Sequence, residues 1–228
     1  MPPILLVDVN ETLLDLRPLD PLFERLLGDR ALRPIWFAQM LQVAFVGIIT
    51  ARYIDFTSAQ HAALAMIAER RGLSLRRDDA EEIVGAMSAL PAYPDVPAAL
   101  DRLAGQGFRI AALVNSVAAV GEAQLRNAGI RDLFERVLSA ESIGTLKPAP
   151  EPYRMAAATF AVPTTETCLV SAHSWDIAGA LAAGCEAAFV ARPGMVMMPI
   201  GPSPRIVGRD LAEVAEALIA ASAPPGGG

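Results

Sequence analysis

Polar side chains fall in four short groups, each at the end of an apolar run or at the start of a helical pattern. The groups are Asp8 with Asn10; Asn115 and Ser116; Lys147; and residues 171–176 with Ser171, His173 and Asp176. A carboxylate with a lysine beside it can act as a nucleophile, because the positive charge keeps the carboxylate ionised and orients it. Each group also has a structural interpretation, since such residues cap turns and helices, complement a helix dipole or lie solvated at the surface. All four together favour a catalytic site.

The elements that would bring these groups together alternate along most of the chain. The predicted strands are residues 4–9, 109–114, 168–170 and 187–191, and the predicted helices are 96–105, 120–128, 151–160 and 177–183. This alternation predicts an α/β fold, with a Rossmann-like doubly wound parallel sheet covered on both faces. Ligands bind at the carboxyl ends of the strands in such sheets, so the four groups are expected to meet at one edge.

Residues 16–91 break this alternation. Helical spacing recurs over 19–27, 34–50, 56–72 and 77–90, and none of these segments has a strand pattern. We therefore predict an α-helical cap at 16–91, inserted into a Rossmann-like core formed by 1–15 and 92–223. Residues 224–228, rich in Pro and Gly, are predicted to be a disordered tail.

The composition limits the partners and the location of the protein. The formal charge of −6 and the shortness of every basic run argue against binding to nucleic acid. The most apolar run, 43–51, is shorter than the roughly 20 residues of a membrane-spanning helix, and the first residues lack a signal-peptide pattern. Nothing demands a disulfide between Cys168 and Cys185, so a cytoplasmic location is expected. Residues 43–49 are a candidate homodimer face.

The order of the four groups resembles the haloacid dehalogenase superfamily of hydrolases. The matching motifs are Asp8 followed by Thr12-Leu13, Val114-Asn115 at the end of a strand, Lys147 in "GTLKPAPEPYRMA" and Asp176 in "LVSAHSWDIAGALAAG". The resemblance covers nearly the whole chain and includes a helical cap in the expected place. Within the superfamily, "DVNETLLD" and "SAHSWD" are most similar to the type II branch, which comprises the 2-haloacid dehalogenases.

This resemblance implies a covalent mechanism on a small 2-haloalkanoic acid. Asp8 would attack C2 and expel the halide, and water would then hydrolyse the ester to release a 2-hydroxy acid. Lys147 would pair with Asp8, and Asp176 would hold Lys147 and is a candidate to activate the water. Backbone N–H groups near Asp8 and after the second strand would bind the substrate carboxylate and the developing oxyanion. The implied substrate-binding residues are Val9, Asn10, Glu11, Asn115, Ser116, Ser171 and His173, with Phe37 and Gln39 from the cap.

Asn10 distinguishes this chemistry from the main alternative within the superfamily. The phosphatases of the superfamily carry a second Asp two residues after the nucleophile as the acid for the leaving group, and they need Mg²⁺. Asn10 occupies that position and cannot donate a proton in this role, whereas a halide leaves without protonation. No cofactor or metal is therefore expected, with Mg²⁺ required only under the alternative of a phosphatase acting on a small phosphorylated metabolite.

Two positions depart from the dehalogenase pattern. Val114 stands where the second motif normally ends in Ser or Thr, and Phe37 stands where the cap helix normally carries an arginine. Gln39 and Gln42 are neutral donors on the same stretch, while Arg33 and Arg52 lie at a different helical phase. The aromatic and apolar residues of this stretch also fit an ordinary helix core. These departures keep a third alternative open, a non-catalytic protein that binds a small molecule or a partner.

Overall fold

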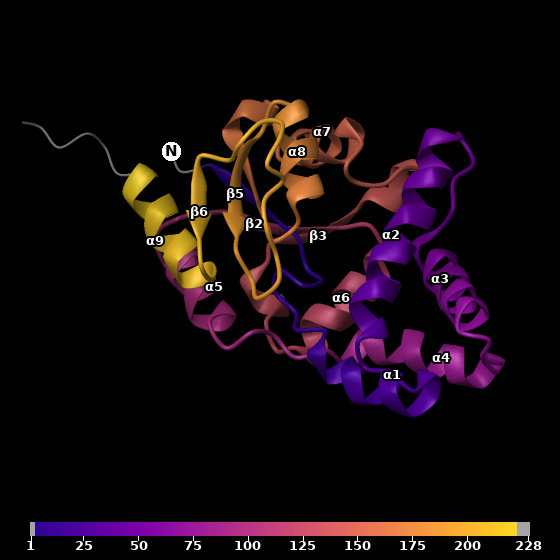
Figure 1. The fold of residues 1–228 in the computed structure, drawn as a ribbon. Helices are drawn as coiled ribbons and strands as arrows, with labels where there is room; N and C mark the ends of the chain where they lie inside the picture. The colour runs from indigo at the N-terminus through magenta and orange to yellow at the C-terminus, as the bar shows by residue number, and fades with distance from the viewer. Residues whose placement is uncertain (1–2, 223–228) are drawn as a thin grey trace, which may run out of the picture.

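Six short strands pair in parallel to form the central sheet of the computed structural model, which describes residues 3–222 (Figure 1). Their order across the sheet is β3-β2-β1-β4-β5-β6. The strands are β1 (Ile4–Val7), β2 (Ile110–Val114), β3 (Arg136–Ser139), β4 (Thr167–Ser171), β5 (Glu186–Val190) and β6 (Ile206–Gly208). The predicted α/β fold class is confirmed. The tail predicted at 224–228 lies outside the described residues.

Alternate residues of β1, β2, β4 and β5 enter two separate hydrophobic clusters, one on each face of the sheet. In β1, Leu5 and Val7 belong to one cluster, and Ile4 and Leu6 belong to the other. The first face is covered by α5 (Val96–Gly105), α6 (Ala118–Asn127) and α9 (Leu211–Ser222), and the second by α7 (Pro150–Thr159) and α8 (Ser174–Ala182). Helices on both faces bury the parallel sheet, as the near-continuous apolar strands require.

Of the α-helices between β1 and β2, the first four stand together at one side of the sheet (Figure 1). They are α1 (Asp20–Leu27), α2 (Leu32–Ile49), α3 (Phe56–Arg70) and α4 (Arg77–Ala86). Trp36 of α2 is fully buried, and its indole N–H donates to the carbonyl oxygen of Gln60 on α3 at 3.0 Å. Asp55 caps α3, because its carboxylate accepts from the backbone N–H of Ser58 at 2.8 Å. The helices are in place where the sequence patterns predicted them, within about four residues at each end.

Two strands and one helix have no counterpart in the sequence-based expectations. β3 and β6 are the two edge strands, and both are short and partly exposed, so neither has the continuous apolar run of a central strand. Helix α9 covers the first face beside α5. Five short 3₁₀ helices complete the described elements: Arg17–Leu19, Met87–Ala89, Arg131–Leu133, Ala140–Ile143 and Thr164–Glu166.

Helix α2 is long and apolar enough to cross a bilayer, judged by length and composition alone. One side of it packs into the larger hydrophobic cluster through Trp36, Met40 and Ala44, so a buried core helix explains the same apolar composition. Cys168 and Cys185 are both free and buried.

Helix α8 approaches the loop before α7 closely at Gly179. A Cβ atom at this position would lie 2.5 Å from the carbonyl oxygen of Pro148 and 2.7 Å from the hydroxyl of Tyr153. Because backbone atoms form part of this contact, the loop that carries Lys147 would have to move to accept a side chain.

We expect Gly179→Ala to lower the free energy of unfolding by about 1–3 kcal/mol, since overpacking outweighs the helical preference of alanine. The matched control is Gly85→Ala on α4, where a Cβ atom would meet open space and should leave stability unchanged or raise it by roughly 0.5–1 kcal/mol. Urea unfolding followed by circular dichroism measures both. Equal stabilities of the two variants would contradict the close approach.

Candidate active site

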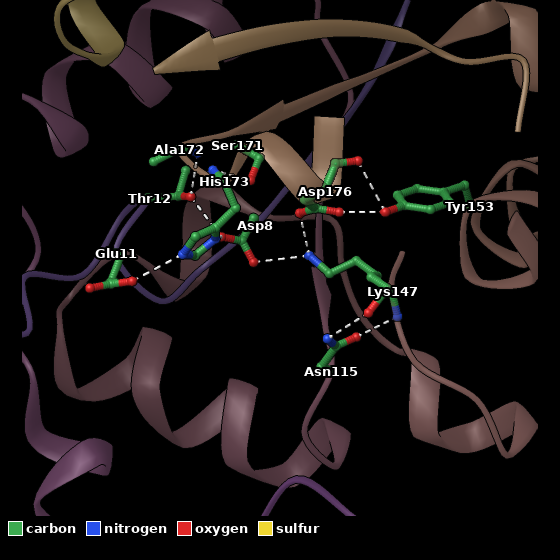
Figure 2. A network of polar contacts seen from close by, with 10 residues as sticks. All are labelled: Asp8, Glu11, Thr12, Asn115, Lys147, Tyr153, Ser171, Ala172, His173 and Asp176. Carbon is green, nitrogen blue, oxygen red and sulfur yellow. Dashed lines mark hydrogen bonds and ion pairs between the residues drawn. The ribbon is translucent and has the colours of Figure 1, made fainter. Parts of the chain in front are cut away.

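The chain turns sharply after β1 and presents the carboxylate of Asp8 at the carboxyl edge of the sheet. The backbone N–H of Asp8 still bonds to Val170 of β4 at 3.0 Å, and the carbonyl of Val9 then accepts from the N–H groups of Leu13 and Leu14. This turn ends strand pairing at once, so Asp8 lies beyond the ladder but remains buried among polar partners. Figure 2 shows those partners.

Lys147 lies between two carboxylates. Its Nζ atom is 2.9 Å from Oδ1 of Asp8 and 2.8 Å from Oδ2 of Asp176, and only 1% of its side chain is exposed (Figure 2). Asn115 holds the lysine backbone from both sides, because its Oδ1 accepts from the Lys147 N–H at 2.7 Å and its Nδ2 donates to the Lys147 carbonyl at 3.2 Å. The end of β2 thus positions the lysine.

Tyr153 of α7 completes the coordination of Asp176. Its hydroxyl donates to Oδ1 of Asp176 at 2.5 Å, while Oδ2 of Asp176 bonds to Lys147. Burial and the negative charge of Asp176 raise the pKa of Tyr153 well above its usual value, so the hydroxyl stays a donor. Both oxygens of this fully buried carboxylate are therefore occupied.

His173 joins two acidic side chains. Its Nδ1 lies 3.1 Å from Oδ2 of Asp8, and its Nε2 lies 3.0 Å from Oε2 of Glu11 (Figure 2). The ring also stacks on Phe37 of α2 at a centroid distance of 5.9 Å and on Trp175 of α8 at 5.0 Å. These contacts fix both the plane of the imidazole and the direction of each ring nitrogen.

Thr12 ties the loop after β1 to the loop after β4. Its hydroxyl donates to Oδ2 of Asp8 at 2.6 Å and accepts from the N–H of Ala172 at 2.9 Å. The Nε atom of buried Arg192 donates to the carbonyl oxygen of Thr12 at 3.0 Å. Since Lys147 binds Oδ1 and Thr12 binds Oδ2, the carboxylate of Asp8 is held at both oxygens.

These contacts determine the charges in the site. Burial raises the pKa of Asp8, but the charge of Lys147 and the hydrogen bonds from His173 and Thr12 outweigh it and hold that pKa well below its usual value. Burial lowers the pKa of Lys147, and the charges of Asp176 and Asp8 outweigh this and raise it. Burial likewise lowers the pKa of His173, whereas its bonds to Asp8 and Glu11 raise it to about 10. At neutral pH the Asp8 anion lies between two cations.

A cavity of about 20 Å³ opens beside the Asp8 carboxylate, which is room for little more than a water molecule. Its wall combines polar atoms at the strand ends with apolar side chains from α2 and α3. The lining residues are Asp8, Val9, Asn10, Phe37, Leu41, Phe56, Val114, Asn115, His173 and Trp175.

The structure brings most of the predicted site residues to this edge. Asp8, Lys147 and Asp176 are hydrogen-bonded in series, and Val9, Asn10, Phe37, Asn115 and His173 line the cavity. Glu11 contacts His173 and does not line the cavity. Ser171 and Ser116 are buried behind the wall, where Ser171 accepts from the N–H of His173 and the carbonyl of Ser116 accepts from Ser139.

Gln39 lies outside the cavity. Its amide donates to the side chain of Gln42 at 2.7 Å, and both residues line a separate hollow beside Arg70 of α3. Phe37 and Gln39 lie on nearly opposite sides of α2, because residues two apart on a helix point in different directions, so Phe37 faces the site and Gln39 does not. Gln39 contacts none of the catalytic candidates in this conformation.

Sequence reasoning did not assign site roles to several residues that the structure places there. They are Thr12, Tyr153, Trp175, Leu41, Phe56 and Arg192. Thr12, Tyr153 and Trp175 stand inside the quoted motifs, and Tyr153 lies six residues after Lys147, so the motifs themselves contain a signal for them. Phe56 and Arg192 come from distant segments, and only the tertiary fold indicates their place.

Asn10 is held by a neutral partner. Its side-chain oxygen accepts from Nε2 of Gln124 on α6 at 3.0 Å. Within residues 3–222, no group of three or more His, Cys, Asp or Glu side chains is arranged to hold a metal ion.

Known proteins resemble this chain in sequence and fold. The model of the haloacid dehalogenase-like hydrolase family matches residues 3–184. (S)-2-haloacid dehalogenase H-109 of Pseudomonas putida is 28% identical over 189 residues, which are 83% of this chain and 84% of that protein. (S)-2-haloacid dehalogenase 1 of Pseudomonas sp. (strain CBS-3) is 31% identical over 153 residues, 67% of each protein.

The fold agrees with these matches. The structure of L-2-haloacid dehalogenase from Xanthobacter autotrophicus, with chloropropionic acid covalently bound, aligns with a TM-score of 0.90 at 24% identity and covers 98% of this chain and 100% of that one. The family match over residues 3–184 includes Asp8, Lys147 and Asp176. The resemblance seen in the sequence is confirmed, and the chain belongs to the haloacid dehalogenase-like hydrolases.

Proposed function

We propose that the protein hydrolyses the carbon–halogen bond of a small 2-haloalkanoic acid through an ester on Asp8. The observation that carries this proposal is the buried Asp8 carboxylate, which is held ionised at the wall of a cavity beside Asn10 and lacks an acidic partner there. The named relatives are 2-haloacid dehalogenases, and the related Xanthobacter enzyme holds chloropropionic acid covalently. The product would be a 2-hydroxy acid.

The geometry suits attack by a carboxylate. Lys147, Thr12 and His173 keep Asp8 ionised and limit its rotation, so an oxygen faces the cavity without the entropy cost of orienting a free side chain. As the ester forms, the negative charge leaves Asp8 with the halide. Lys147 and Thr12 then polarise the ester carbonyl and stabilise the oxyanion that water attack creates.

The substrate carboxylate and the departing halide need hydrogen-bond donors from other residues, because the side chains of Phe37 and Val114 carry no charge. Backbone N–H groups after β1 and at Asn115 and Ser116 are the donors proposed for the substrate carboxylate and the developing oxyanion. The indole nitrogen of Trp175 is buried and has no hydrogen-bond partner within the described chain, and Trp175 lines the cavity. We propose its N–H as a donor to the departing halide.

The small cavity implies that side chains above Asp8 move when substrate enters. Phe37 and Leu41 of α2 and Phe56 of α3 form that cover. We propose that residues 16–91 act as a cap over a core formed by 1–15 and 92–223, and that opening of the cap admits the haloacid.

Two other functions predict different chemistry. A phosphatase would need an acid for its leaving group, and Asn10 offers only an amide whose oxygen accepts from Gln124. A non-catalytic binding protein would not need a buried lysine between two carboxylates, because burying such charges is costly unless they serve a role. A small-molecule substrate and a cytoplasmic location complete the proposal.

We expect steady halide release from 2-chloropropionate that EDTA does not inhibit, and no phosphate release from p-nitrophenyl phosphate with or without Mg²⁺. Asp8→Asn should reduce halide release to the uncatalysed rate, because the neutral amide is not a nucleophile. Asp15→Asn is the matched control, since Asp15 pairs with Arg17 outside the cavity. If the protein released phosphate in a reaction that needed both Mg²⁺ and Asp8, the proposed dehalogenase activity would be wrong and the phosphatase alternative would be supported. If neither halide nor phosphate were released from these substrates or from a wider panel, the non-catalytic binding protein would be favoured.

We expect Val114→Thr to lower the KM for 2-chloropropionate roughly five-fold, because one added hydrogen bond to an anionic substrate is worth about 1 kcal/mol. Threonine is isosteric with valine, so the wall of the cavity keeps its shape. Val114→Ala removes volume without adding a donor and is the control for a packing effect. An unchanged or higher KM in Val114→Thr would show that this position does not face the substrate anion.

The exposed end of α2 is the proposed homodimer face. Val46 is 50% exposed and Ile49 is 83% exposed, and apolar surface of this kind on a helix commonly pairs with another protein. Gel filtration over a range of concentrations should give a dimer, and Val46→Glu with Ile49→Glu should convert it to a monomer. A monomer at every concentration would rule this face out.

A further inference from the structure

The cavity contains two titratable side chains. Of the ten residues that line it within the described chain, Asp8 and His173 alone can exchange a proton. In the proposed reaction Asp8 becomes an ester, and the water that attacks this ester must transfer a proton to another group. Asp176 is poorly placed to receive it, because Lys147 and Tyr153 occupy its oxygens at 2.8 and 2.5 Å and the side chain does not reach the cavity.

His173 is positioned for this proton transfer. Its Nδ1 lies 3.1 Å from Oδ2 of Asp8, within hydrogen-bond reach of a water that approaches the carbonyl carbon of an Asp8 ester. Its Nε2 lies 3.0 Å from Oε2 of Glu11, so the neutral ring would keep its proton on Nε2 and direct the lone pair of Nδ1 toward Asp8. A base oriented by a third group is the recurring arrangement of nucleophilic catalysis.

The backbone of Glu11 adds an independent sign that this contact is functional. Glu11 has φ = 58°, in the left-handed region that a non-glycine residue enters at a cost of roughly 1–3 kcal/mol. Its carboxylate lies between His173 and Arg33 of α2, whose Nη1 is 3.5 Å away. The prediction that Arg33 lies at a different helical phase from Phe37 is wrong, because residues four apart share one face of a helix. Backbone outliers such as Glu11 cluster at active sites, where surrounding contacts hold them.

We propose that His173, oriented by Glu11, is the general base that deprotonates the hydrolytic water on the Asp8 ester. This inference rests on the proposed function and adds a catalytic residue to its second step. Asp8 loses its charge in the first step, when the ester forms, and this loss is what converts His173 from a cation into a base for the second step.

The protons and bonds of the cycle balance. In the resting enzyme, the His173 imidazolium donates Nδ1–H to the Asp8 carboxylate. Attack of Asp8 on C2 forms the ester, and the halide leaves with the electron pair of its bond. His173 has then lost the anion that held its proton, and that proton passes to solvent.

The second step regenerates the resting charges. The water oxygen bonds to the Asp8 carbonyl carbon while His173 takes one water proton at Nδ1. The tetrahedral adduct collapses by breaking the bond between this carbon and the ester oxygen, and the departing alkoxide takes the hydroxyl proton of the adduct. Asp8 is again ionised and His173 again protonated. Each turnover releases one 2-hydroxy acid, one halide and one proton.

The charged groups around His173 set its pH dependence. Asp8 and Glu11 contact the ring directly and favour the cation, and Arg33 opposes them through Glu11. Lys147 acts on the far side of Asp8, and the contacts from α2 and α8 are the uncharged rings of Phe37 and Trp175. Once Asp8 is esterified, Glu11 is the remaining anion in contact with the ring, so its removal should lower the pKa of His173.

The test follows halide and ester after rapid mixing with 2-chloropropionate in EDTA. Wild type should turn over steadily. His173→Asn should release a burst of about one chloride per active site and then slow roughly 10²- to 10⁴-fold, the usual range for loss of a general base. After acid quench, the peptide containing Asp8 should carry the mass of one carboxyethyl ester. His61→Asn, at the only other histidine of the chain, should behave as wild type, because His61 lies on α3 in a long contact with Glu81.

The outcomes separate the two levels of the proposal. If wild type releases no halide, the proposed function fails. If wild type releases halide and folded His173→Asn gives no burst and no ester, or keeps its steady rate, the function stands and the role of His173 as base is overturned.

A pH series keeps the inference testable if His173→Asn does not fold. As pH falls, a protonated His173 cannot accept the water proton, whereas Asp8 stays ionised because its pKa is lowered. Wild type should therefore accumulate ester at low pH, and Glu11→Gln should do so only at a lower pH. No ester at any pH in wild type, or the same transition in both proteins, would overturn the inference.

Discussion

The position of Lys147 between Asp8 and Asp176 is the interaction on which the rest of the site depends. Three buried charges are in direct contact: the Nζ atom of Lys147 lies 2.9 Å from an oxygen of Asp8 and 2.8 Å from an oxygen of Asp176. An isolated buried charge costs several kcal/mol, so loss of any one member leaves the others uncompensated. The same contacts that balance this cost keep Asp8 ionised. The stability of this edge of the sheet and the ionised state of Asp8 thus have a common origin.

The order of the strands in the sheet brings Asp8, Lys147 and Asp176 together. β1, β2 and β4 are neighbours, so their following loops meet at one edge although they lie far apart in the chain. Side chains then join the loops to one another: Asn115 holds the backbone of Lys147, and Thr12 holds the backbone of Ala172. Each link joins a side chain from one loop to the backbone of another. The candidate catalytic atoms are therefore positioned by the rigid sheet together with these links between its loops.

The parts of the structure that could be predicted from sequence are those that local patterns specify. Fully buried central strands such as β1 and β4 have continuous apolar runs, and the polar residues after them have no partner within the strand. The edge strands β3 and β6 have no such run. Side-chain direction within α2 is also a tertiary property, which is why Phe37 reaches the cavity while Gln39 lies on another surface. The place of Tyr153 in the site is likewise a tertiary property, because it depends on how α7 packs against α8.

Glu11 shows how a local departure from the ordinary rules carries functional information. A glycine would adopt φ = 58° without strain, so for the fold alone glutamate is the less stable choice. Its carboxylate, however, fixes Nε2 of His173, and Nδ1 of His173 in turn contacts Asp8. The imidazole of His173 is protonated in the resting site, because the carboxylates of Asp8 and Glu11 raise its pKa. A reaction that removes the charge of one of these carboxylates would allow the ring to act as a base, and the proposed ester formation on Asp8 is such a reaction.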